Sequence, residues 1–122
     1  MILVDTSIWI DHLHQTEPVL AANLQNDLVG THPAIIEELA AGTLAHRQQF
    51  LVSLSRLPSL PVMSHAEFLA LTDHYRLWGQ GLSPTDIHLI GAVMLSPGSS
   101  LWTRDARLLR AADHLGLATI TA

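Results

Sequence analysis

The sequence contains neither cysteine nor lysine, and each absence removes a class of chemistry. Without cysteine, the chain has no disulfide framework and no thiolate metal site, and a reducing cytoplasm is its simplest compartment. All six basic residues are arginine. Mechanisms that need a lysine, such as a P-loop, a Schiff base or a receiver-type phosphoacceptor site, are therefore excluded.

Long apolar runs and an excess of positive charge are also missing. No run of about 18 apolar residues occurs, so no membrane-spanning segment is expected, and the N-terminus lacks the basic and apolar regions of a signal peptide. The formal net charge of −5 argues against non-specific nucleic-acid binding through a basic surface. With 122 residues, 48% of them hydrophobic and 14% charged, the chain is predicted to form one globular domain over residues 1–122.

Short apolar runs alternate with helical patterns along the chain. This alternation predicts an α/β domain in which helices cover both faces of a parallel sheet. Ligands bind such sheets beyond the carboxyl ends of the strands. Strands are expected at residues 2–4, 28–29, 60–63, 101–102 and 118–120, and helices at 18–28, 33–41, 45–57, 65–78, 84–95 and 106–115.

Two aspartates follow closely after apolar strand patterns. Asp5 ends the stretch MILVD, and Asp105 ends the stretch LWTRD. Either could simply cap the helix that comes next, which is a common role for aspartate. If the two strands are neighbours, their carboxylates meet at one edge of the sheet, and a divalent cation is the usual way to neutralise like charges held so close.

A third aspartate, Asp86, shares a helix face with apolar residues. It is in register with Leu89, Ile90 and Val93, so its carboxylate is expected to face inward, where an unpaired charge is costly. Ser83, three residues before it, also matches a capping box. Both interpretations of Asp86 stay open at this point.

The glutamates and histidines are less decisive. Glu37 and Glu38 lie on opposite edges of the apolar stripe of their helix, and periodicity does not choose between them. None of the eight histidines has the spacing of a histidine metal site, and no Gly-x-Ser-x-Gly elbow supports a Ser-His-Asp triad. Most of the histidines are therefore interpreted as surface or packing residues.

Four segments carry a resemblance to a known family: ILVDTSIWIDHL, EELAAG, GLSPTDIHLIGA and LWTRDARLL. The chain resembles PIN-domain ribonucleases, and more closely the VapC-type toxins of bacterial toxin–antitoxin pairs, over essentially its whole length. The resemblance implies a PIN-like domain with a five-stranded parallel sheet flanked by helices. It places the catalytic, metal-binding acids of the family at Asp5, Glu38, Asp86 and Asp105, and the supporting hydroxyls at Ser7 and Thr103.

The resemblance also implies an activity, a Mg²⁺- or Mn²⁺-dependent endoribonuclease that acts as a toxin. Carboxylates without cysteine or a histidine cluster are the oxygen-rich donors that these ions prefer. Arg104 and Arg107 flank Asp105 and are the nearest candidates for contacting RNA, although arginines on a solvated helix face are equally common. A VapB-type antitoxin, an RNA substrate (tRNA, rRNA or mRNA), a homodimer and a cytoplasmic location are further expectations.

Two other classes of function remain alternatives. The first is a catalytically inactive PIN-fold module that binds RNA or protein, and the presence of all four matched acids argues against it. The second is a metal-dependent phosphatase or receiver-like domain. That class needs a lysine, and it also needs a second aspartate two residues after Asp5, where the chain has Ser7. Nothing in the sequence distinguishes RNA from DNA as the substrate.

Overall fold

Four short parallel strands form the centre of the computed structural model, which describes all 122 residues. Leu3 pairs with Gly30 on one side and with Leu101 on the other, so the first strand lies between the second and the third. The sheet order is β2-β1-β3-β4. All the pairings are parallel, as the α/β alternation predicted. The strands are β1 (Ile2–Val4), β2 (Val29–Gly30), β3 (Ser100–Trp102) and β4 (Thr119–Ile120).

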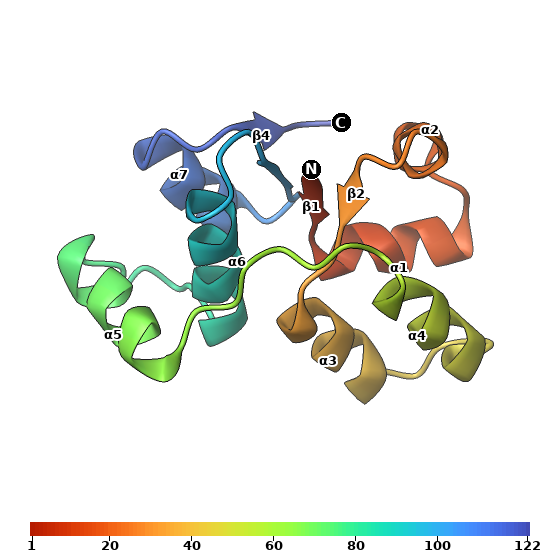
Figure 1. Cartoon of the computed structure of the whole chain (residues 1–122), viewed down its shortest axis with the longest axis horizontal. Helices are drawn as coiled ribbons and strands as arrows, with labels where there is room; N and C mark the ends of the chain where they lie inside the picture. The colour runs from red at the N-terminus through yellow and green to blue at the C-terminus, as the bar shows by residue number, and fades with distance from the viewer.

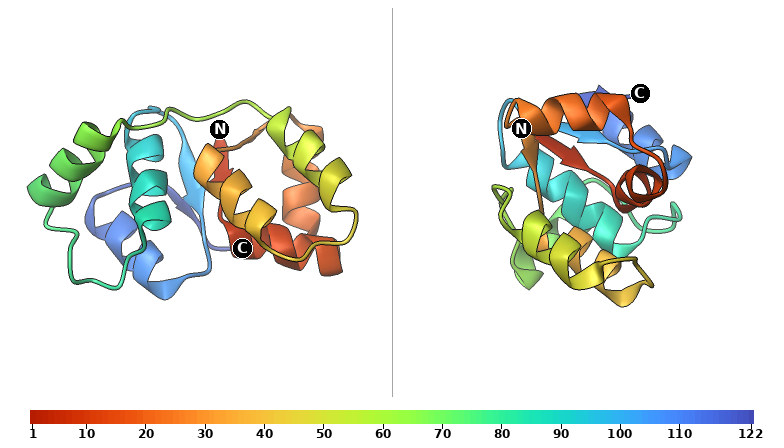
Figure 2. Two further views of the ribbon diagram at one scale, coloured as in Figure 1. Left: turned by 90° about the horizontal axis from the view of Figure 1, so that it is seen from below. Right: turned by 90° about the vertical axis from the view of Figure 1, so that its right-hand side faces the viewer.

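Helices lie on both sides of this sheet. In Figure 1, α5, α6 and α7 are on the left, α1 to α4 are on the right, and the strands run between the two groups. Figure 2 shows α5 outside α6 at one end of the molecule, with α4 toward the opposite end. The helices are α1 (Thr6–His14), α2 (Pro18–Gln25), α3 (Pro33–Ala41), α4 (Arg47–Ser55), α5 (His65–His74), α6 (Pro84–Met94) and α7 (Ala106–His114).

The strand predicted at residues 60–63 does not form, so the sheet has four strands and not five. One parallel bridge takes its place, between Thr31 and Ser59. The amide of Thr31 donates to the carbonyl of Pro58 at 2.8 Å, and the amide of Leu60 donates to the carbonyl of Thr31 at 2.8 Å. Pro61 follows directly and has no N–H to give, so the ladder ends there.

Three of the predicted helices included a residue with a left-handed backbone, and the real helices do not reach it. Asp27 (φ 56°) lies just after α2, Arg76 (φ 53°) just after α5, and His46 (φ 52°) just before α4. A residue in this conformation cannot continue a helix, and it closes many helices at the position after the cap. Glycine is the usual residue in this conformation, and these three positions have other residues, so no local pattern marked the helix ends.

The core places the carboxyl ends of β1 and β3 side by side. Leu3 and Val4 of β1 and Leu101 and Trp102 of β3 are fully buried, and they belong to one cluster of 22 buried hydrophobic residues. Because β1 is the point where the strand order reverses, the crevice beyond β1 and β3 is where an open α/β sheet binds its ligands. None of the helices is long and apolar enough to cross a bilayer.

Candidate active site

A polar cleft of about 620 Å³ opens beyond the carboxyl ends of β1 and β3. All four acids assigned from the sequence line it, although they come from segments spread over most of the chain. The first and last belong to the β1–α1 and β3–α7 junctions, and the other two to α3 and α6. The lining residues are Asp5, Glu38, Asp86 and Asp105 together with Thr6, Ser7, Ile10, Gly81, Ser83 and Arg104.

The hydroxyl of Thr103 connects the two acids that follow the central strands. Its Oγ1 donates to Oδ2 of Asp5 at 2.7 Å and accepts from the backbone amide of Asp105 at 3.0 Å. Thr103 and Asp5 are both buried, at 2% and 8% exposure, so water cannot replace this contact. The backbone amide of Asp5 also donates to the carbonyl of Trp102 at 2.9 Å, which holds the two junctions together.

Three of the acids also cap helices, so the two interpretations of these residues are compatible. Asp5 Oδ1 accepts from the amide of Thr6 at 2.8 Å at the start of α1. Asp105 Oδ1 accepts from the amide of Arg107 at 2.9 Å, and Asp86 forms a full capping box with Ser83. Each carboxylate uses one oxygen in this way. Three helix N-termini therefore surround the cleft, and their partial positive charges offset part of its negative charge.

Glu38 is the glutamate of α3 that reaches the cleft. Its Oε1 accepts a 2.6 Å hydrogen bond from the hydroxyl of Thr6, which lies in the first turn of α1. Glu37 does not line this cleft. The geometry thus separates two residues that the helical periodicity could not.

Burial and mutual repulsion raise the pKa of two of the acids. For Asp5, burial is the largest cause and the charges of Asp86 and Glu38 add to it, while the hydrogen bonds from Thr103 and Thr6 act in the opposite direction. For Asp86, burial again raises the pKa most, and the charges of Asp105 and Glu38 raise it further against the bonds from Ser83. The acids therefore form one electrostatically coupled group.

The donor set fits a hydrated, hard cation. Every ligand candidate is a carboxylate or hydroxyl oxygen, and none of the four acids that line the cleft forms an ion pair with a basic side chain. No three acidic or histidine side chains are placed so that they could hold one ion together. Mg²⁺ does not need such a cage, since it keeps several waters and takes one or two carboxylates directly.

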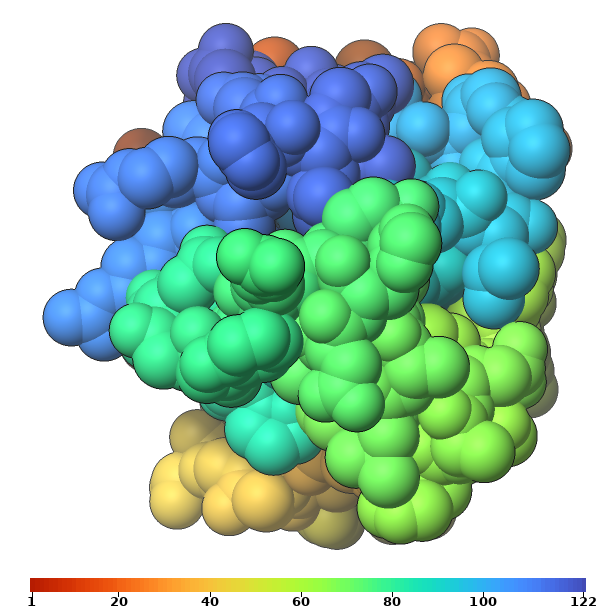
Figure 3. Space-filling model, turned by 90° about the vertical axis from the view of Figure 1, so that its left-hand side faces the viewer, coloured from red at the N-terminus to blue at the C-terminus, as the bar shows by residue number.

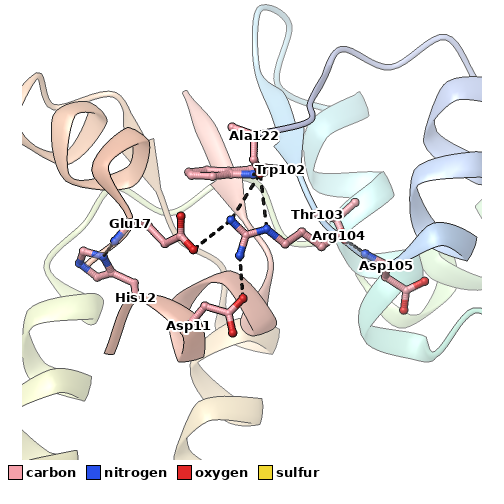
Figure 4. Close-up of polar contacts among 8 residues, drawn as sticks. All are labelled: Asp11, His12, Glu17, Trp102, Thr103, Arg104, Asp105 and Ala122. Atoms are coloured by element: carbon pink, nitrogen blue, oxygen red, sulfur yellow. Dashed lines mark hydrogen bonds and ion pairs between the residues drawn. The ribbon is translucent and has the colours of Figure 1, made fainter. Parts of the chain in front are cut away.

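Arg104 lines the cleft, but acidic residues outside the cleft hold its side chain. Its Nη1 donates to Asp11 Oδ2 at 2.6 Å, and its Nη2 lies 3.1 Å from Glu17 Oε1. Figure 4 shows the Arg104 side chain turned toward these two acids and the Asp105 side chain turned the other way. RNA contact by Arg104 stays a prediction that would require these ion pairs to open. The exposed Arg107 has no acidic partner.

Thr6 in the cleft and His32 outside it had no sequence signal of their own. Thr6 orients Glu38, whereas the predicted supporting hydroxyl of Ser7 lines the cleft without a hydrogen bond to a carboxylate. His32 is 1% exposed and caps α3, because its Nδ1 accepts from the amide of Ala34 at 3.0 Å. Histidine is an unusual N-cap, so the sequence did not indicate this role. The burial of His32 in the structure distinguishes it from the surface histidines.

The site thus consists of four coupled carboxylates at the switch point of a parallel sheet. Residues 2–114 match the PIN domain. The chain belongs to the PIN-domain family. Ribonuclease VapC32 of Mycobacterium tuberculosis is 47% identical to this PIN domain over 118 residues, in strain CDC 1551 / Oshkosh and in strain ATCC 25618 / H37Rv. The similarity covers 97% of this chain and 95% of that ribonuclease, so this PIN domain is of the VapC type.

Proposed function

We propose that this PIN domain, as a single domain over residues 1–122, is an endoribonuclease that depends on Mg²⁺ or Mn²⁺ and is the toxin of a toxin–antitoxin pair. The observation that carries the proposal is the convergence of Asp5, Glu38, Asp86 and Asp105 on one cleft. The name of the VapC32 relative supports RNA as the substrate. A VapB-type antitoxin, a homodimer and a cytoplasmic location belong to the same proposal, as does a tRNA, rRNA or mRNA target.

In this mechanism the aspartates would bind the cation, and Glu38 would act on the attacking water. Asp5, with Asp86 or Asp105, would hold the cation, because these carboxylates follow the central strands or lie in the first turn of α6. When bound, a divalent cation lowers the pKa of water and offsets negative charge on the reacting phosphate. Glu38 would orient or deprotonate the attacking water, since the Thr6 hydroxyl fixes one of its oxygens and leaves the other free.

In-line attack by water on the phosphodiester needs no covalent intermediate. The phosphorus–oxygen bond to the 3′ oxygen would break, giving a 5′-phosphate and a 3′-hydroxyl. This suits a chain without cysteine or lysine nucleophiles. Ser7 would support the acidic group, and Arg104 and Arg107 would contact the RNA from the α7 side of the cleft.

The direct test is cleavage of a structured RNA pool by the purified protein. Cutting is expected with Mg²⁺ or Mn²⁺, and it should disappear with EDTA and in the Asp86→Asn variant. Asparagine keeps an oxygen that can accept from the Ser83 amide, as Asp86 does at 2.9 Å, so the start of α6 should remain capped. Cutting that continues in EDTA would refute the metal-dependent mechanism. A protein that binds RNA but never cuts it would favour the inactive binding module.

A further inference from the structure

A second polar cavity lies beside the acidic cleft. Its volume is about 460 Å³, and no hydrophobic residue lines it. It shares Gly81 with the acidic cleft, so the two cavities adjoin at this residue. Its lining is formed by the turn that precedes α6 and by the exposed face of α7: Gly79, Gln80, Gly81, Arg107 and Arg110.

The two arginines of this cavity are free of protein partners. They are three residues apart on α7, so their side chains are neighbours on one helix face, and both are exposed. Neither makes an ion pair, and neither side chain makes a hydrogen bond, whereas Arg104 makes both ion pairs found in the protein. Two unpaired cations therefore stand next to a strongly acidic cleft in a chain with only six basic residues.

One glycine of this turn, Gly81, leaves room for the Arg107 side chain. Gly79 and Gly81 both have left-handed backbones, with φ of 71° and 77°. A Cβ at Gly81 would lie 2.8 Å from Cδ of Arg107, whereas a Cβ at Gly79 would meet nothing within 4 Å. The bare turn at Gly81 thus lets the Arg107 side chain lie against it. Figure 3 shows this turn, in green to teal, beside the blue surface of α7.

We propose that this cavity, defined by residues 79–81 with Arg107 and Arg110, binds a backbone phosphate of single-stranded RNA next to the phosphate that is cut. The assignment rests on the ribonuclease function proposed above. It adds the path of the RNA strand, which would leave the acidic cleft across Gly81 and run along α7. Guanidinium groups suit this role because they bind phosphate with paired N–H donors. They would also supply the positive charge that the acidic cleft lacks.

The salt dependence of RNA binding tests the contact between the arginines and a phosphate independently of cleavage. The affinity of a labelled 12-nucleotide single-stranded RNA is measured in the Asp86→Asn background between 50 and 300 mM salt. Arg107→Gln and Arg110→Gln should each reduce the magnitude of the slope of log K against log salt by about 0.7. Each should also reduce the affinity by about fivefold at 0.1 M salt. Arg56→Gln, the same change at an exposed site after α4, should change neither quantity.

Two further experiments identify the group that the arginines contact. A neutral methylphosphonate at the linkage next to the cleaved one should weaken binding in the single Asp86→Asn protein and have no effect once both arginines are replaced. Gly81→Ala should weaken RNA binding as Arg107→Gln does. Gly98→Ala, which places alanine on a similar left-handed backbone (φ 85°) outside both cavities and meets nothing within 4 Å, should not weaken it. Equal affinities and slopes for the arginine variants and Arg56→Gln would overturn the proposal.

Different results would refute the phosphate site and the ribonuclease function. If the wild-type protein cuts RNA with Mg²⁺ while the arginine variants bind and cut as it does, only the phosphate site is wrong. If the wild-type protein cuts no RNA with either metal, the ribonuclease function is wrong, whatever the salt slopes show. A higher KM with kcat retained in the arginine variants supports both.

Discussion

Replacing Thr103 by valine should show how much the junction between β1 and β3 depends on one hydroxyl. Valine keeps the shape of the side chain but removes the donor to Asp5 and the acceptor for the Asp105 amide, which lie at 2.7 and 3.0 Å. A hydrogen bond to a charged group contributes about 1.5–3 kcal/mol, and water cannot restore it at a residue that is 2% exposed. We expect a loss of about 2–3 kcal/mol in the free energy of unfolding at pH 7.

Thr103→Ser is the matched control, because serine keeps the hydroxyl and loses one buried methyl group, which costs about 1 kcal/mol. Both variants are unfolded with urea in EDTA, and the midpoints are compared at equal m-values. The Thr103 bond lowers the pKa of Asp5 by favouring its charged form. The extra cost of valine should therefore shrink as pH falls and Asp5 becomes protonated. Equal stability of the two variants at pH 7, or a cost independent of pH, would refute this account.

Three other perturbations test separate parts of the structure. Asp86→Asn should reduce cleavage at least about 100-fold. In EDTA at pH 7 it should be as stable as the wild type or more stable, because the raised pKa of Asp86 means that its ionised form opposes folding. His32→Asn should remove one contribution to the pH dependence of stability. Burial and the nearby His88 lower the pKa of His32 to about 4, so the unfolded chain binds the proton first as pH falls. In the wild type this residue should lower the free energy of unfolding by up to about 3 kcal/mol between pH 6.5 and 4. Gly30→Ala should cost about 1–3 kcal/mol because its Cβ would overlap the Leu60 side chain, and Leu60→Ala should relieve part of that cost in the double variant.

Each of these predictions has its own control. The cleavage loss is compared with thermal unfolding of the same Asp86→Asn preparation, and a large drop in stability would contradict the electrostatic argument. For the pH dependence, His65→Asn changes an exposed histidine and should leave the slope unchanged, while an unchanged slope in His32→Asn would contradict the burial argument. Additive costs at Gly30 and Leu60 would show that the two side chains do not compete for the same space.

The fold was predictable where the pattern of apolar residues decides the structure. Short apolar runs between helices indicated a parallel α/β sheet, and the structure has one. The prediction failed at residues 60–63, where the apolar run suggested a strand but Pro61 cannot extend a ladder. The helix ends were missed at Asp27, His46 and Arg76, because left-handed residues other than glycine leave no local signal.

The candidate site was predictable to the extent that it follows from strand ends. Asp5 and Asp105 follow parallel strands, so the sequence placed them at one edge of the sheet, on the condition that their strands are neighbours. The structure meets that condition, because β1 pairs with β3. Glu38 needed the resemblance, since periodicity treats it and Glu37 alike. The bond from Thr6 to Glu38 spans 32 residues, and the ion pair of Arg104 spans 93 residues to Asp11, so neither has a local pattern.

The most direct test of the shared carboxylate site is a comparison of RNA cleavage by its four single amide variants. Asp5→Asn, Glu38→Gln, Asp86→Asn and Asp105→Asn each remove one charge from the cleft, and Glu37→Gln removes the same charge one residue away from it. Initial rates with Mg²⁺ are measured on one single-stranded RNA, with folding checked by circular dichroism. We predict a loss of at least about 100-fold for each of the four variants and a rate near that of the wild type for Glu37→Gln. Full activity in any of the four folded variants would contradict a single catalytic site built from all of them.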